Sequence, residues 1–272
     1  MSTIDDYVLG RHEKEYARLA FQSRLYEPMT RRLFQDAGIV PGMSVLDLGS
    51  GAGDVCMLLA EIVGPNGKVT GIDMDPDAIE HARSRVDAAG LTNVEFQCCG
   101  FGDYNPAVPV DAIAGRLVLM YQADPATALA RVIRHLRPGG IAAFLELWMQ
   151  KRPAHPGSVT TKAGNWIVET MQRSGAHLDA GPKLHTIFTS AGLPVPSMRA
   201  EFLMDGNADS PLFQYFADTL ESLMPKAIEY GILTEGEIDL ASFPAQAQAE
   251  LSSVGYAMLI GPMVSAWCRT PA

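Results

Sequence analysis

The chain has 272 residues, of which 47% are hydrophobic and 19% are charged, so it holds apolar material for a large core and is not disordered as a whole. Its 21 Lys and Arg residues against 31 Asp and Glu residues give a formal net charge of −10. Because phosphate groups are bound by clustered cations, this balance argues against a nucleic acid or an anionic membrane as the main partner.

The four cysteines do not form a disulfide framework. Cys98 and Cys99 are adjacent, Cys56 and Cys268 stand alone, and none has the spacing of a zinc or redox site, so we expect reduced thiols and no metal. The start of the chain carries acids and no apolar signal segment, and the uncharged stretch 251–268 contains too many Ser, Gly and Pro residues for a membrane span. We therefore expect a cytoplasmic protein.

Two helices are expected first, an amphipathic one over 12–26 and a second that begins near Pro28 and ends at Gly38. Short apolar strands and helices then alternate. The expected strands are 44–48, 68–73, 94–97, 112–117 and 141–148, and the expected helices are 55–63, 76–89 and 125–136. This alternation predicts a doubly wound α/β fold, with a mostly parallel sheet and helices on both faces.

The alternation ends after Trp148. Further helices are expected near 163–173, 184–191, 210–230 and 235–252, and further strands at 198–204 and 263–268. The helical part is rich in Met and aromatic residues, which indicates an adaptable apolar cavity or a helical layer with its own core. The same layer could also form the surface of a homodimer.

The segment from Val45 to Asp54 (VLDLGSGAGD) carries the chemical information, together with Asp73 at the end of the next strand. Glycines between a strand and a helix let a ligand approach the backbone. An acid at the end of the second strand can accept both hydroxyls of a ribose. We therefore expect a nucleoside-containing cofactor at the carboxyl edge of the sheet.

The spacing of the glycines narrows the choice of cofactor. In a dinucleotide fingerprint the third glycine would occupy position 54, but Asp54 stands there, and a carboxylate disfavours a pyrophosphate at a helix N-terminus. Asp47 adds negative charge just before the loop. A cationic cofactor without phosphate, S-adenosylmethionine, fits better, which leaves a nicotinamide-dependent oxidoreductase as a disfavoured alternative.

Three motifs resemble those of class I S-adenosylmethionine-dependent methyltransferases: Asp47-x-Gly-x-Gly-x-Gly53, Gly71-Ile-Asp73, and Leu136-Arg-Pro-Gly-Gly140 before the fifth strand. The resemblance covers 40–150 well, and 181–204 and 262–271 loosely. The opening Tyr7-Val-Leu-Gly10, with several positions of the first helix, resembles a bacterial subgroup of small-molecule methyltransferases. These positions are Glu15, Arg18, Leu19 and Gln22.

The resemblance implies a Rossmann-like fold with N-terminal cap helices and a helical lid inserted around the last strands. We expect the chain to divide into cap helices 1–40, a cofactor-binding core 41–150, a lid segment 151–180, a continuation of the core 181–204, a helical insert 205–262 and a last core strand 263–272.

The resemblance also implies roles for individual residues. Asp47, Gly49, Ser50 and Gly51 would run along the methionine portion of the cofactor, and Asp73 would hold the ribose, with Met74 against the adenine.

The family often places a Gly-Asp pair after the third strand, where its Asp contacts the adenine. This chain has Cys99-Gly-Phe101 there, so either the backbone near Gly100 and Phe101 reads the adenine, which we prefer, or Asp103 is displaced into the role.

Further candidates come from the cap helix and the strand ends. Arg116 would bind the cofactor near its reactive methyl group, and Gln22 and Tyr26 of the first helix, which caps the cofactor cleft in related folds, would touch the cofactor. Glu146, at the end of the fifth strand, would orient the acceptor or act as a base, and the alternative is a structural ion pair with Arg116. Tyr121 would line the pocket or simply pack.

These features predict a methyltransferase that acts on O, N or C of a mid-sized, partly apolar small molecule. The alternative is a protein that binds S-adenosylmethionine but catalyses a cyclisation or isomerisation without methyl transfer. A nucleic-acid methyltransferase is disfavoured because the run Arg116–Tyr121 contains no Asn-Pro-Pro-Tyr tetrad. We expect no nucleic-acid or membrane partner.

Overall fold

The computed structural model describes residues 13–151 and 158–272. The sequence motif Tyr7–Gly10 and part of the expected lid segment lie outside these residues. None of the helices in these ranges combines the length and the hydrophobicity that a membrane span requires.

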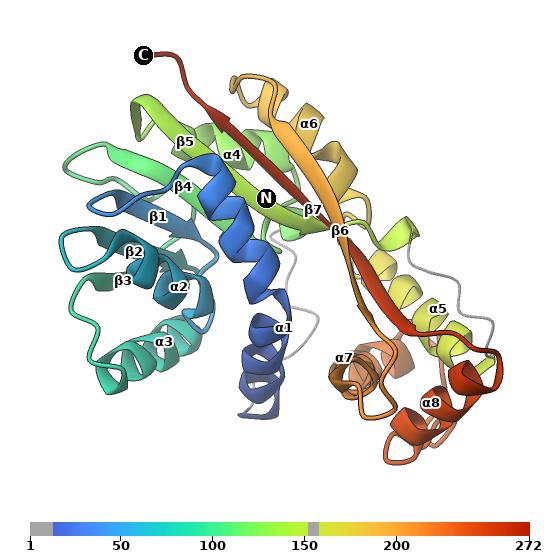
Figure 1. Ribbon diagram of the computed structural model, residues 1–272. Coiled ribbons are helices and arrows are strands. Elements are labelled where there is room, and N and C mark those ends of the chain that lie inside the picture. The colour runs from blue at the N-terminus through green and yellow to red at the C-terminus, as the bar shows by residue number, and fades with distance from the viewer. Residues whose placement is uncertain (1–12, 152–157) are drawn as a thin grey trace.

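A seven-stranded sheet forms the centre of the molecule (Figure 1). Its strands are β1 (Ser44–Leu48), β2 (Lys68–Asp73), β3 (Val94–Cys98), β4 (Val110–Arg116), β5 (Leu136–Leu147), β6 (Ser197–Asp205) and β7 (Met258–Arg269). Their order is β3-β2-β1-β4-β5-β7-β6, and only β7 runs antiparallel to its neighbours. The expected mostly parallel α/β fold is confirmed. The strand order reverses between β1 and β4, which is where open α/β sheets bind their ligands.

The helices cover both faces of the sheet and form an additional layer. They are α1 (Glu13–Ala37), α2 (Asp54–Val63), α3 (Pro76–Ala88), α4 (Pro125–Ile133), α5 (Ser158–Arg173), α6 (Ala180–Ser190), α7 (Pro211–Glu229) and α8 (Phe243–Ser253), with the short 3₁₀ helices η1 (Leu119–Tyr121) and η2 (Met149–Lys151). The first three helices pack on one face, and α4 and α6 pack on the other (Figure 1).

The expected break in the first helix is absent, because α1 continues through Pro28. Proline removes one backbone hydrogen bond and normally interrupts a helix. Here the residues on both sides of it are anchored in the core, with Tyr26, Met29 and Leu33 each at most 3% exposed. Tertiary packing therefore outweighs the local cost of the proline.

Several other expected boundaries were wrong; for example, α5 begins at Ser158 and not near 163, and β7 begins at Met258 and not at 263. β5 begins at Leu136, so it includes the Arg-Pro-Gly-Gly segment that local composition predicts as a turn, because Leu136 pairs with Val110 across a shift in register. The last helix begins at Phe243 and not near 235, since residues 235–242 form turns.

The apolar core is divided between the sheet and a separate helical layer. One cluster lies on each face of the sheet, and a third lies among α5, α7 and α8, around side chains such as Leu220, Phe243 and Leu251. The long antiparallel pair of β6 and β7 extends from the sheet to this layer (Figure 1). Four partly buried side chains contact both the sheet cluster beneath α1 and the helical layer: Leu25, Leu117, Leu203 and Ile260.

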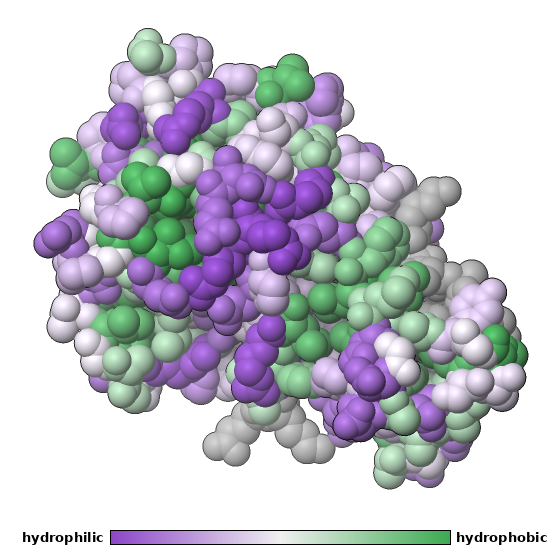
Figure 2. Space-filling view, in the orientation of Figure 1, coloured by the Kyte–Doolittle hydropathy of each residue, from purple (hydrophilic) through white to green (hydrophobic). Residues whose placement is uncertain are grey.

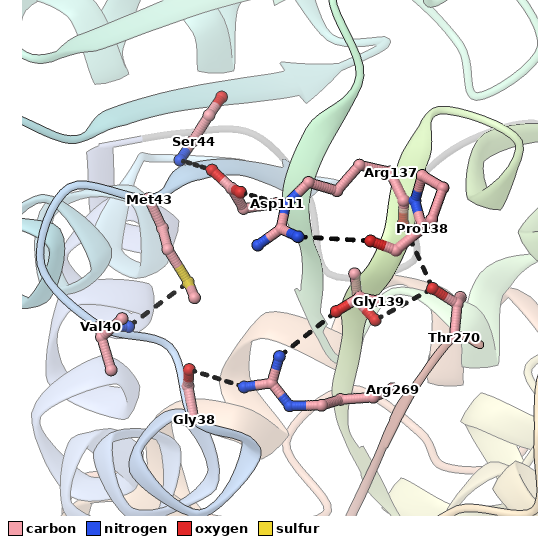
Figure 3. A network of polar contacts seen from close by, with 11 residues as sticks. Gly38, Val40, Met43, Ser44, Asp111, Arg137, Pro138, Gly139, Arg269 and Thr270 are labelled. Atoms are coloured by element: carbon pink, nitrogen blue, oxygen red, sulfur yellow. Dashed lines mark hydrogen bonds and ion pairs between the residues drawn. The ribbon is translucent and has the colours of Figure 1, made fainter. Parts of the chain in front are cut away.

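A polar network lies at the edge of the sheet where the parallel strands begin, opposite the edge at which open α/β sheets bind ligands (Figure 3). Asp111 accepts hydrogen bonds from the backbone N–H of Ser44 and from the guanidinium of Arg137. Arg269 donates to the carbonyl oxygens of Gly38 and Gly139. These groups satisfy one another's hydrogen bonds and connect four segments of the chain, so we assign this edge a role in stability and not in ligand binding.

Candidate active site

The glycine loop after β1 presents bare backbone at the carboxyl edge of the sheet. Gly49, Gly51 and Gly53 all have left-handed backbone, with φ of 61°, 49° and 84°. A Cβ added to Gly49 would lie 2.3 Å from Cγ2 of Val118, whereas a Cβ added to Gly51 would meet nothing within 4 Å. Gly49 is therefore required for packing, while Gly51 leaves space for a ligand beside the backbone.

Asp73 joins this loop to the end of β2. One oxygen of its carboxylate accepts the backbone N–H of Gly51 at 2.9 Å, and the other accepts the N–H of Asp75 at 2.9 Å. Each carboxylate oxygen can accept a further hydrogen bond, so the group can still bind two ligand hydroxyls. The hydroxyl of Ser50 is buried and has no hydrogen-bond partner among the described residues.

Asp47 lies beneath the loop on the face that α1 and α2 cover. It is 1% exposed, and its carboxylate accepts a hydrogen bond from the Cys56 thiol at 3.1 Å. Burial raises the pKa of Asp47 to about 7, although the thiol and Arg116 act in the opposite direction. The floor of the site therefore carries a carboxyl group that is ready to ionise near neutral pH.

The ends of β2 and β3 meet beside Met74, an apolar side chain that is 63% exposed. A Cβ on Gly100 would lie 3.2 Å from a carboxylate oxygen of Asp103 and 3.7 Å from the sulfur of Met74. Phe101 is partly buried against the α4 and α6 face of the core. Both groups considered for adenine recognition, the backbone near Gly100 and the carboxylate of Asp103, thus come together at one place.

Arg116 ends β4 on the same face as Asp47. Its guanidinium donates to the hydroxyls of Ser23 at 3.1 Å and Thr30 at 3.3 Å, both on α1, and forms no ion pair with any described carboxylate. Burial lowers its pKa. The alternative of a structural ion pair with Glu146 is not found, because Glu146 lies on the opposite face of the sheet.

Glu146 is fully buried and bonded to backbone. One oxygen accepts the N–H groups of Val118 at 2.9 Å and Leu119 at 2.8 Å, and the other has no partner among the described residues. Burial raises the pKa of Glu146 to about 7 against the effect of these N–H groups. The preceding residue in this turn, Leu117, has a φ of 55°, which is unusual for a side chain of this type. Glu146 therefore holds a strained turn at the end of β4.

The helix α7 adds a tyrosine that the sequence analysis did not assign to the site. The hydroxyl of Tyr215 donates to Oε1 of Gln22 at 3.0 Å and lies 3.2 Å from the hydroxyl of Tyr26. Because a hydroxyl carries one hydrogen, Tyr26 must donate to Tyr215, and the oxygen of Tyr26 is left to accept. Three aromatic residues within 213–216 were a signal for a core, but no local pattern shows which of them reaches α1.

The interface between α1 and α7 also contains a buried ion pair. Arg18 and Glu15, 4% and 5% exposed, are 2.6 Å apart, and Ser222 of α7 donates to Glu15. Arg18 also donates to Gln22 at 2.8 Å. With Tyr26, these α1 side chains form a polar stripe at helical spacing that fixes how the two helices dock.

Tyr121, the other candidate for catalysis, ends η1. It is partly buried and packs against the cluster of the helical layer, so it lies between the end of β4 and that layer.

The structure is that of an α/β protein with an exposed glycine loop at the carboxyl edge of its sheet, and comparisons identify its family. A family model described as "Methyltransferase domain" matches residues 39–192. Because this match covers more than half of the chain, the protein belongs to this methyltransferase family, as the sequence motifs indicated.

Two relatives illustrate the range of the family. The chain is 33% identical over 198 residues to an arsenite methyltransferase of Halobacterium salinarum, covering 70% of this chain and 48% of the relative. It is 37% identical over 134 residues to the aklanonic acid methyltransferase DauC of a Streptomyces species, covering 47% and 58%. The chain spans about half the length of the curated relatives it matches.

Solved structures extend the likeness to nearly the whole fold. The crystal structure of the [4+2]-cyclase SpnF is similar with a TM-score of 0.53 and 18% identity, over 90% of this chain and 80% of that one. At this level of identity the similarity concerns the fold alone.

Proposed function

We propose that this chain transfers a methyl group from S-adenosylmethionine to O, N or C of a mid-sized, partly apolar small molecule. The observation that carries the proposal is the Asp73–Gly51 hydrogen bond beside open space at Gly51. It joins a ribose-binding acid to bare backbone at the switch point of the sheet.

The residues present fit the cofactor. Asp73 would bind the ribose hydroxyls, and Met74 would lie against the adenine, with the Asp103 carboxylate or the backbone near Gly100 at its amino group. The buried hydroxyl of Ser50 has no partner in the part of the chain that the structure describes, and the backbone at Gly51 is uncovered. Asp47 supplies the negative charge that a sulfonium or ammonium group favours.

When bound, the cofactor supplies a methyl group that the positive charge on its sulfur activates for displacement. The work of the protein is then to align the acceptor with that methyl group and to exclude water, which can be worth about 7–11 kcal/mol of barrier at the upper end. Leu117 and the turn after it lie where the acceptor would approach, and Glu146 holds that turn through Val118 and Leu119. We therefore assign Glu146 a positioning role and not that of a base, because it is fully buried on the face of the sheet opposite α1 and holds the turn through one of its oxygens.

The acceptor would lie under α1 and α7. Both helices fall outside the part of the chain that the family model matches, so they are suited to determine acceptor specificity. Figure 2 shows hydrophobic surface between α1 and α7, and Leu25 and Ile260 pack on both apolar clusters there. The hydroxyls of Tyr26 and Tyr215 are buried with Gln22 between the two helices, and their hydrogen bonds fix how α1 and α7 frame this surface. The relatives named for arsenite and aklanonic acid also act on small molecules.

Calorimetry with S-adenosylhomocysteine tests the cofactor assignment without knowledge of the acceptor. The parent chain should bind it, and Asp73→Asn should bind it about 10- to 100-fold more weakly, because hydrogen bonds to a charged group are worth about 1.5–3 kcal/mol. Asp77→Ala, an exposed acid in the first turn of α3, is the matched control and should bind like the parent. Absence of binding by the parent would contradict the proposal.

Incubation with cofactor labelled in its methyl group tests the reaction. Transfer of label to members of a small-molecule panel would support methyl transfer. Rearrangement of an acceptor that depends on cofactor but carries no label would replace it with the cyclase or isomerase alternative.

A further inference from the structure

Arg116 is a cation at the switch point of the sheet that no described carboxylate neutralises by an ion pair. It ends β4, beside the carboxyl end of β1, and is partly buried under α1. The groups that accept its hydrogen bonds are the two neutral hydroxyls of Ser23 and Thr30. Charges removed from water are normally paired, so this arrangement is costly unless a ligand completes it.

The carboxylates whose charges act on Arg116 are already engaged elsewhere. Asp54 forms an ion pair with Arg85 at 2.8 Å, and Asp47 accepts the thiol of Cys56. The other buried arginine of this region, Arg18, is held by Glu15. Arg116 therefore has N–H groups to spare, and no carboxylate of the described residues forms an ion pair with it.

The two hydroxyls beside Arg116 differ in what they can still offer. Thr30 donates its hydrogen to the carbonyl oxygen of Tyr26 at 2.8 Å, as helical threonines often do. Ser23 accepts from Arg116, and its own hydrogen is not used by any described group. The guanidinium and the Ser23 O–H together form a donor set for one anion.

We propose that Arg116, assisted by Ser23, binds the carboxylate of a ligand at the end of β4. A planar guanidinium matches a carboxylate with two parallel hydrogen bonds. One guanidinium can neutralise one negative charge, and Asp47 and Asp54, whose charges also act on Arg116, repel further negative charge. Both effects favour a carboxylate over a phosphate. The carboxylate belongs either to the aminoacyl end of the cofactor or to the acceptor. This inference rests on the proposed function for the identity of the cofactor, but not for the existence of the anion site.

A matched pair of ligands separates these two sources. S-adenosylhomocysteine carries the aminoacyl group, and 5′-methylthioadenosine is the same nucleoside thioether without it. Calorimetry would compare both ligands on the parent, Arg116→Gln and Arg116→Lys. Arg24→Gln is the control, because it removes an exposed arginine of α1 that follows Ser23 in sequence. Thermal unfolding would confirm that each variant is folded.

If Arg116 binds the cofactor, Arg116→Gln should weaken S-adenosylhomocysteine about 10- to 100-fold and leave methylthioadenosine unchanged, and Arg116→Lys should recover part of the loss. If Arg116 binds the acceptor, both nucleosides should bind normally. Benzoate should then be detected by ligand-observed NMR on the parent but not on Arg116→Gln, with benzamide as the uncharged control.

The failure of the anion site and the failure of the proposed function would give different results. If Arg116→Gln matches the parent for both nucleosides and for benzoate, the anion site is refuted while the proposed function stands. If the parent binds neither nucleoside, the proposed function fails, and the benzoate comparison still decides whether Arg116 is an anion site.

Discussion

The two sides of the candidate site are built by different means. The cofactor side, at the ends of β1 and β2, uses backbone: three left-handed glycines and one acid that accepts two backbone N–H groups. The proposed acceptor side, between α1 and α7, uses side chains that belong to helices far apart in sequence, such as Gln22 and Tyr215. The first can be recognised from a short motif, whereas the second exists only after the helices dock.

This difference agrees with the division of the chain. The part matched by the family model, 39–192, contains the cofactor side, and both helices of the acceptor side lie outside it. Enzymes that share a cofactor can share the segment that binds it, whereas enzymes with different acceptors need different residues around the acceptor. Disturbing each side separately should therefore give separable defects.

The largest effect on stability is expected in the helical layer. Phe243 is fully buried and stacks on Phe216 at 5.8 Å between ring centroids. Phe243→Ala should destabilise the protein by about 3–5 kcal/mol, because it leaves a cavity in that cluster. Urea unfolding measures this, and S-adenosylhomocysteine binding measured below the transition should persist. Loss of binding in the folded variant would show that the two regions are coupled.

The second effect concerns pH and Glu146. Burial raises its folded pKa from 4.5 to about 7, so the folded state holds the proton more tightly than the unfolded state. Its contribution to stability is present below pH 4.5 and is lost as pH rises toward 7, by roughly 3 kcal/mol in all.

Glu146→Gln removes this dependence. Denaturation between pH 4.5 and 8 should show a shallower decline for the variant than for the parent. The pKa of Asp47 is also raised to about 7, and Asp47 is present in both proteins. The difference between the two curves therefore reports the contribution of Glu146 alone. Parallel curves would mean that Glu146 is ionised throughout. Glu146→Ala, which cannot accept the two N–H groups, should lower turnover more than the Gln variant.

The third prediction separates packing from binding within the glycine loop. Gly49→Ala places a Cβ against Val118 and should cost about 2–4 kcal/mol of stability, from left-handed backbone plus overpacking. Gly51→Ala has the same backbone strain but open space, so it should cost only about 1–2 kcal/mol. Gly51→Ala should nevertheless cause the larger loss of S-adenosylhomocysteine affinity of the two variants, relative to the stability that each variant loses. Calorimetry measures the affinity and thermal unfolding measures the stability of each variant. Normal S-adenosylhomocysteine affinity of Gly51→Ala would mean that the cofactor does not bind beside Gly51.

The smallest effect is expected at Tyr215. Tyr215→Phe removes one hydroxyl and leaves its ring in the core, which costs about 0.5–1.5 kcal/mol. S-adenosylhomocysteine affinity should be unchanged, while the KM for an acceptor found in the labelled-methyl panel should rise, because Tyr26 and Gln22 lose the partner that orients them. Phe213→Leu, a nearby core change without a polar group, is the control. A change in cofactor affinity with KM unaffected would assign Tyr215 to the other side of the site.

Much of the fold was predictable because its signals are local. Strand and helix alternation from Ser44 to Leu147, and the Pro residues that begin α3 and α4 after capping acids, depend on neighbours in sequence. The errors lie where distant packing decides, as in α1 at Pro28, whose neighbours are held by the core, and in β5 at Leu136, whose partner is Val110.

The sequence by itself determined the α/β class, the glycine loop and Asp73, because short-range backbone geometry and the end of one strand define them. Tertiary structure decided which charges are paired. It placed Glu146 under the turn after β4 and left Arg116 to two hydroxyls on the opposite face, because side chains alternate between the faces of a sheet. It also brought Tyr215 to Tyr26 across 189 residues, a contact that depends on how two helices pack and that no local pattern encodes.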